Sequence, residues 1–99
     1  MATRFVEIIL DSAALAAHGI EGRDEIEDPL SQDLADSGLG EVTGGGVGGG
    51  VATIDVEIDE AADFDAALSF LMSKLRSYGA PADTRIRPEG SSADEELRL

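Results

Sequence analysis

The stretch VATIDVEID, residues 51–59, has the clearest strand pattern in the chain. Apolar and polar side chains alternate along it, so they point to opposite faces of a strand. The apolar face consists of Ala52, Ile54, Val56 and Ile58, and the polar face consists of Thr53, Asp55, Glu57 and Asp59. This alternation is typical of an antiparallel sheet that is covered on one face only. The stretch therefore predicts a sheet with one face against a core and the other in water.

The run EVTGGGVGGGV, residues 41–51, precedes this strand and holds six of the twelve glycines. A phosphate-binding loop needs backbone N–H groups at the start of a helix and usually a basic residue nearby. Here the glycines lead into a strand, and no Lys or Arg occurs between Arg23 and Lys74. We therefore expect a hairpin with its turn at residues 48–50. A glycine-rich edge strand that accepts a partner's strand is the alternative.

The segments after the central strand predict a helix and a last strand. Apolar residues recur every three or four positions from Asp63 to Tyr78, which predicts an amphipathic helix that Gly79 ends. DTRIRP, residues 83–88, predicts a short strand. Residues 89–99 are polar and acidic, so we expect a disordered tail after a single domain of residues 1–88.

The segments before the glycine run predict a strand and a loop. RFVEIIL, residues 4–10, is apolar on both faces except at Glu7, which predicts a central strand. Because Glu7 interrupts the apolar run, we expect no signal peptide here. Residues 11–23 contain Gly19 and Gly22, which limit any helix there, so we predict a loop with at most one helical turn.

Residues 24–40 predict a short amphipathic helix that ends at Gly38. Asp28 followed by Pro29 is typical of an N-cap and first helical position. Asp24 and Glu27 have capping-box spacing, which leaves an earlier first turn open.

The expected order is strand, helix, strand, strand, helix, strand. Right-handed crossovers fold this order into a four-stranded antiparallel sheet with both helices on one face. We predict an α+β fold of the ferredoxin-like, two-layer type. The expected strand order across the sheet is fourth, first, third, second.

The composition is strongly acidic. Twenty-one Asp and Glu against seven Lys and Arg give a formal net charge of −14. A field of this sign repels nucleic acid and anionic membranes and attracts basic protein surfaces. We therefore expect no nucleic-acid partner and a basic protein as partner, although solubility or salt adaptation also explains the acidity. No apolar stretch approaches the roughly 18 to 20 residues of a membrane helix, so we expect no membrane partner.

The absence of cysteine excludes disulfides and thiolate chemistry and fits a reducing compartment. We expect a cytoplasmic protein from a bacterium or an archaeon. His18 stands alone in an Ala-rich segment, and the carboxylates match no calcium loop. We therefore predict no catalytic residue, no cofactor and no metal site.

Two surfaces are candidates for binding. The candidate partner surface consists of Glu21, Asp24, Glu25, Glu27, Asp28, Asp55, Glu57 and Asp59. The candidate homodimer face consists of Phe5, Glu7, Ile9, Arg85 and Arg87. In the expected strand order, an acidic row and a basic row flank a partly apolar strand, and such a face is self-complementary under a two-fold rotation. A merely solvated face is the alternative.

DSGLGEVTGGG, IDVEI and LRSYGAPADTRI, within residues 23–86, resemble turns and strands of small bacterial ferredoxin-like proteins. Several members of this group are uncharacterised and some are similar to toxin-immunity proteins. The resemblance implies the fold and carries no catalytic residue.

The leading functional hypothesis is a non-enzymatic protein that binds a basic partner, for example a toxin whose active site it blocks. The alternative is a small-ligand regulatory module that binds its ligand at a dimer interface or beside the glycine hairpin. An enzyme ranks third, and the fold does not decide among them.

Overall fold

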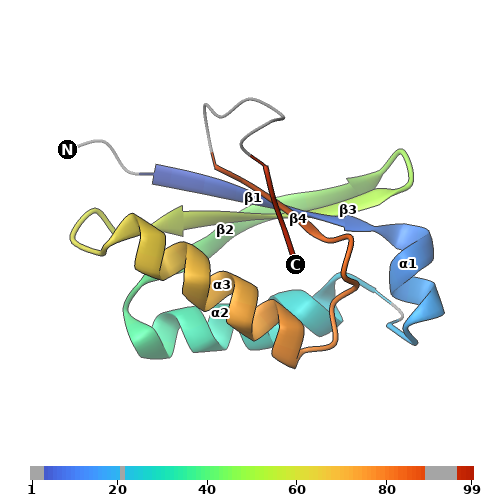
Figure 1. Cartoon of the computed structure of the whole chain (residues 1–99), viewed down its shortest axis with the longest axis horizontal. Helices are drawn as coiled ribbons and strands as arrows, with labels where there is room; N and C mark the ends of the chain where they lie inside the picture. Colours follow the sequence, from blue (N-terminus) through green and yellow to red (C-terminus); the bar gives the residue numbers. More distant parts are fainter. Residues whose placement is uncertain (1–3, 21, 89–95) are drawn as a thin grey trace.

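The computed structural model describes residues 4–20, 22–88 and 96–99, with the exception of the side chain of Arg4. Its elements are β1 (Arg4–Asp11), α1 (Ser12–Ala17), α2 (Asp24–Ser37), β2 (Gly40–Gly48), β3 (Val51–Ile58), α3 (Phe64–Ser77), β4 (Arg85–Pro88) and β5 (Leu97–Arg98). They form an α+β fold with one antiparallel sheet, in the order β2-β3-β1-β4-β5. Helices α2 and α3 lie together on one face of this sheet (Figure 1).

The core lies between the sheet and the helices. The alternating residues of β1 and β3 that face the helices are buried, as predicted from residues 51–59. The helices contribute one apolar stripe each, and the main buried side chains are Ile26, Leu30 and Leu34 of α2 and Ala67, Leu71 and Leu75 of α3. The other face of β3 is only half-buried, which confirms that its two faces differ.

The sheet has five strands, so the prediction of four is wrong. Strands β1 to β4 have the predicted order across the sheet, and β5 pairs with the outer edge of β4. It forms because Leu97 pairs with Ile86 and packs against the core, while the backbone N–H of Leu99 donates to the carbonyl of Thr84 at 3.2 Å. Residues 96–99 of the predicted disordered tail are therefore part of the fold, and residues 89–95 lie outside the described residues.

The helices begin differently from the predictions. Helix α1 occupies six residues of the predicted loop, capped by the Asp11 side chain, which accepts from the N–H of Ala14 at 2.9 Å. Helix α2 begins at Asp24, so Asp28 is not its N-cap and Pro29 lies inside it. The side chain of Glu25 reaches back to the N–H of Gly22, which supports this earlier start.

The glycine run forms the predicted hairpin. Gly49 and Gly50 form its two-residue turn, and both have positive φ, +59° and +82°. A β-bulge lies earlier in the chain, in β2 between Val42 and Gly44. The run therefore turns the chain and supplies an edge strand of the sheet.

Candidate functional site

The side of the sheet away from α2 and α3 is here called the open face (Figure 1). By the strand register it carries most of the polar residues of the strands. The strand register arranges its residues in three rows. The first row is Glu41, Glu57 and Phe5; the second is Gly44, Asp55, Glu7 and Arg87; the third is Gly46, Thr53, Ile9, Arg85 and Arg98. The open face thus brings Asp55 and Glu57 next to the candidate dimer residues.

Glu41 was missed by the sequence analysis and lies directly opposite Glu57. Regular pairing back from the turn would place Glu41 opposite Ile58, on the core side. The bulge at Thr43 shifts the register by one residue, which turns Val42 to the core and Glu41 to the open face. The signal in the sequence is the adjacent pair Glu41-Val42, because only one of the two can face a core.

Four carboxylates, here called the acidic row, gather on this part of the open face. They are Glu41, Asp55 and Glu57 on β2 and β3, and Asp59 directly after β3. Among the described residues, the side chains of Glu41, Asp55 and Glu57 form no ion pair or hydrogen bond, and Asp59 accepts only the N–H of Ala61 at 2.8 Å. Like charges directly opposite each other on neighbouring strands destabilise a sheet. The acidic row therefore carries repulsion that no side chain described by the structure neutralises through an ion pair.

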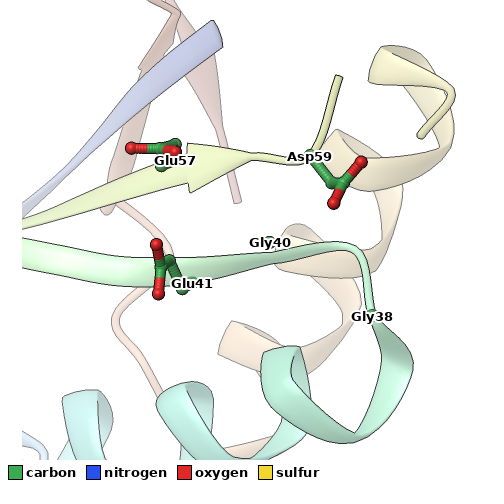
Figure 2. Close-up of a pocket in the computed structure, with 5 residues that line it drawn as sticks. All are labelled: Gly38, Gly40, Glu41, Glu57 and Asp59. Atoms are coloured by element: carbon green, nitrogen blue, oxygen red, sulfur yellow. The ribbon is translucent and has the colours of Figure 1, made fainter. Parts of the chain in front are cut away.

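A hollow of about 260 Å³ lies at the end of the acidic row. Its lining consists of Gly38, Gly40, Glu41, Glu57 and Asp59. Figure 2 shows the three carboxylates distributed over β2, β3 and the segment after β3. No group of three or more His, Cys, Asp or Glu within residues 4–20, 22–88 and 96–99 has the geometry to hold a metal ion.

The other side of the open face is basic and partly neutralised. Arg87 forms an ion pair with Glu96 at 2.6 Å and a longer one with Glu7 at 3.9 Å, and Arg85 approaches Glu96 at 3.8 Å. The hydrogen bond from Arg87 lowers the pKa of Glu96 from its ordinary value, despite the opposing effect of burial. Glu96 was assigned to the tail by the sequence analysis, although it fixes β5 to β4.

The candidate partner surface is divided by the structure. Asp24, Glu25 and Asp28 are exposed on α2, in the helical layer, whereas Asp55 and Glu57 lie on the open face across the sheet. The remaining α2 carboxylate, Glu27, forms an ion pair with Arg23 at 2.8 Å. Glu21 lies outside the described residues. A single partner contact on one flat surface cannot include both groups.

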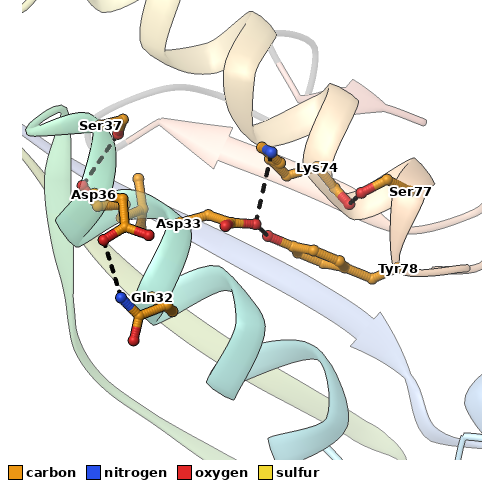
Figure 3. A network of polar contacts seen from close by, with 8 residues as sticks. Gln32, Asp33, Asp36, Ser37, Lys74, Ser77 and Tyr78 are labelled. Atoms are coloured by element: carbon orange, nitrogen blue, oxygen red, sulfur yellow. Dashed lines mark hydrogen bonds and ion pairs between the residues drawn. The ribbon is translucent and has the colours of Figure 1, made fainter.

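A polar network joins α2 to α3 on the helical side (Figure 3). The hydroxyl of Tyr78 donates to Asp33, and Lys74 approaches the same carboxylate at 3.7 Å. Burial, and then the hydrogen bond to Asp33, raises the pKa of Tyr78. A tyrosine with a raised pKa stays protonated and is a poor base or nucleophile, so we assign the network a structural role. His18 is exposed at the C-cap of α1.

Searches of protein-family models, curated proteins and solved structures find no match for this chain. In the described part of the chain, no helix combines the length and apolar character needed to cross a membrane.

Proposed function

We propose that this protein is a non-enzymatic binding protein that uses the acidic row to engage a basic protein partner. An immunity-type inhibitor of a basic toxin is the form of this function that we favour. We also propose a ferredoxin-like topology, extended by β5, and a cytoplasmic location.

The observation that carries the proposal is the pair Glu41 and Glu57. These two carboxylates face each other across β2 and β3 without a cation among the described residues. A sheet normally places opposite charges at such positions, because like charges there reduce stability. A Lys or Arg from a partner would remove this repulsion, so part of the binding free energy would come from relief of a cost in the free protein.

A small-ligand module is the second candidate, and the hollow favours it. Its volume of about 260 Å³ lies below the roughly 300 to 1,000 Å³ of most ligand sites, and its lining contains three carboxylates and two glycines with no large apolar side chain. A ligand held there would be small and cationic. The hollow lacks the apolar walls that bury most ligands, so we place this function second.

Affinity capture tests the proposed function. The tagged protein is exposed to lysate of its own host at low and at high salt, beside the double variant Glu41→Gln, Glu57→Gln. We expect a basic protein that binds the wild type at low salt, is released at high salt and is not captured by the variant. The matched control is Asp24→Asn, Asp28→Asn, which removes the same charge from α2. Equal capture by both variants would contradict the assignment to the acidic row.

A further inference from the structure

The two halves of the open face carry opposite charge. The half on β2 and β3 holds the acidic row, and the half on β4 and β5 holds three of the seven Lys and Arg residues of the chain. These are Arg85, Arg87 and Arg98, which Glu96 neutralises in part. Strand β1 lies between the halves, with Phe5, Glu7 and Ile9 on this face.

Each half retains charge that is not paired within the described chain. Arg98 is exposed and has no carboxylate within ion-pair distance there, although its charge acts on Glu96 more weakly than the charges of Arg85 and Arg87, which form ion pairs with Glu96. On the acidic half, Asp55 has no cationic partner in the same set of residues. Arg98 on β5 and Asp55 on β3 lie on opposite sides of β1, so they cannot pair with each other within one copy of the chain.

We propose that a second copy of the chain covers the open face. Two two-fold axes would bring two such faces together. An axis across the strands places the acidic row over the acidic row, which is repulsive. An axis parallel to the strands and over β1 exchanges the halves and places each acidic half over the basic half of the other copy. Charge complementarity therefore selects the second arrangement.

The register gives the contacts of this dimer. In the second row, Asp55 faces Arg87 of the second copy. Gly44, the neighbour of Asp55 on β2, faces Glu96 of the second copy, which lies beside Arg87. In the third row, Gly46 meets Arg98 of the second copy. No atom lies within 4 Å of where a Cβ on Gly46 would stand. The bare backbone of β2 thus leaves room for the long side chain of Arg98, which can reach Asp55.

Strand β1 lies at the axis, so its residues meet their own copies. Phe5 is 37% exposed and would be buried against Phe5 of the second copy. Ile9, the other apolar side chain of β1 on this face, is only 6% exposed, so its prediction as a contact residue of the dimer face is not supported. Glu7 also meets Glu7, but each carboxylate has Arg87 of its own chain 3.9 Å away. The charge at the axis is therefore compensated only in part, because the same Arg87 also forms the shorter ion pair with Glu96.

This inference goes beyond the proposed function. The second copy would contact Asp55 and cover the acidic half of the open face, where a basic partner would also bind, so self-association and partner binding are expected to be mutually exclusive.

Sedimentation equilibrium of the full chain over a range of protein concentration and salt tests the dimer. The variants are Asp55→Lys, Arg98→Glu and the double variant with both changes, with circular dichroism as the check on folding. We expect a wild-type dimer at low salt that dissociates as salt rises. Each single variant should raise the dissociation constant about tenfold or more, and the double variant, which exchanges the charges, should restore the dimer.

The control is Asp28→Lys, which makes the same charge change as Asp55→Lys at an exposed position of α2. It should leave the dimer through the open face intact. A wild-type protein with the monomer mass of 10.3 kDa at every concentration would overturn the proposal. A dimer that is insensitive to both single changes would also overturn it, because the copies would then associate through another surface. Failure of this dimer would leave the capture experiment on the acidic row unaffected.

Discussion

At the residue scale, Gly45 and Gly46 are neighbours with opposite constraints. Gly45 has φ +154°, and a Cβ there would collide with the carbonyl of Thr53 and lie 2.7 Å from the Arg23 guanidinium. Gly46 has no atom near its Cβ position and no positive φ. The glycine run is therefore a mixture of positions that require glycine and positions that do not.

We expect Gly45→Ala to reduce the free energy of unfolding by about 2 kcal/mol, because it adds both backbone strain and a collision. Gly46→Ala should raise the same free energy by about 0.5 kcal/mol, because it restricts the unfolded chain at no cost to the fold. Urea denaturation of both variants measures the difference. Equal effects of the two changes would show that the edge strand does not have the described conformation.

Thr84 is fully buried, and its hydroxyl oxygen has no hydrogen-bond partner in the described part of the chain. An unsatisfied buried hydroxyl costs about 1 to 3 kcal/mol. Thr84→Val replaces it with a methyl group of similar shape, so we expect a gain in stability of about 1 kcal/mol by thermal or urea denaturation. Thr84→Ser keeps the hydroxyl and removes the methyl group, and it should be destabilising. A loss of stability in the Val variant would mean that the hydroxyl is satisfied.

At the element scale, the hydrogen bond from Tyr78 to Asp33 joins the end of α3 to α2, beside the apolar contacts of both helices in the core. Tyr78→Phe removes it and leaves the ring, so we expect a loss of about 1 kcal/mol in the free energy of unfolding. The control is Ser77→Ala, which removes a neighbouring hydroxyl whose bond stays within α3. That change should cost less than about 0.5 kcal/mol. Equal losses from both changes would contradict a role in joining the helices.

Strand β5 should be sensitive to acid because Glu96 holds it to Arg87. The folded pKa of Glu96 lies below its ordinary value of 4.5. A lowered folded pKa means that the stabilisation is present above the unfolded pKa and is lost as the pH falls through the folded pKa. Wild type should therefore exceed Glu96→Gln in stability at neutral pH, and the difference should vanish in acid.

Hydrogen exchange at the N–H of Leu99, which bonds to Thr84, reports on β5 directly. We expect faster exchange in Glu96→Gln than in wild type at neutral pH. A difference between the two proteins that persists unchanged in acid would contradict the role of the Glu96 carboxylate.

At the scale of the whole molecule, the sequence predicts elements whose pattern is local. The alternation of residues 51–59 and the helical spacing of residues 63–78 both correspond to the observed β3 and α3. Gly38 ends α2 with φ +71°, as its position predicts. These elements depend on side-chain period and capping, which neighbouring residues determine.

The remaining features depend on contacts between distant residues. Pro29 lies within α2 because tertiary packing of Ile26 outweighs the preference of proline for a first turn. β5 forms because β4 offers it an edge, Leu97 packs against the core and Glu96 pairs with Arg87. A strand of two residues is too short to show a pattern in the sequence. Glu41 joins the candidate site through a bulge, whose position the sequence does not specify.

The open face keeps an acidic row without an ion pair to any side chain that the structure describes, and this arrangement is expected to lower the stability of the free protein. The direct measurement is the free energy of unfolding of Glu41→Gln and wild type at low and high salt, at a concentration where both are monomeric. We predict that the variant is more stable than wild type by about 0.5 kcal/mol at low salt and that the difference disappears at high salt. A variant that is less stable than wild type at low salt would show that Glu41 is already paired within the chain, and it would contradict the account.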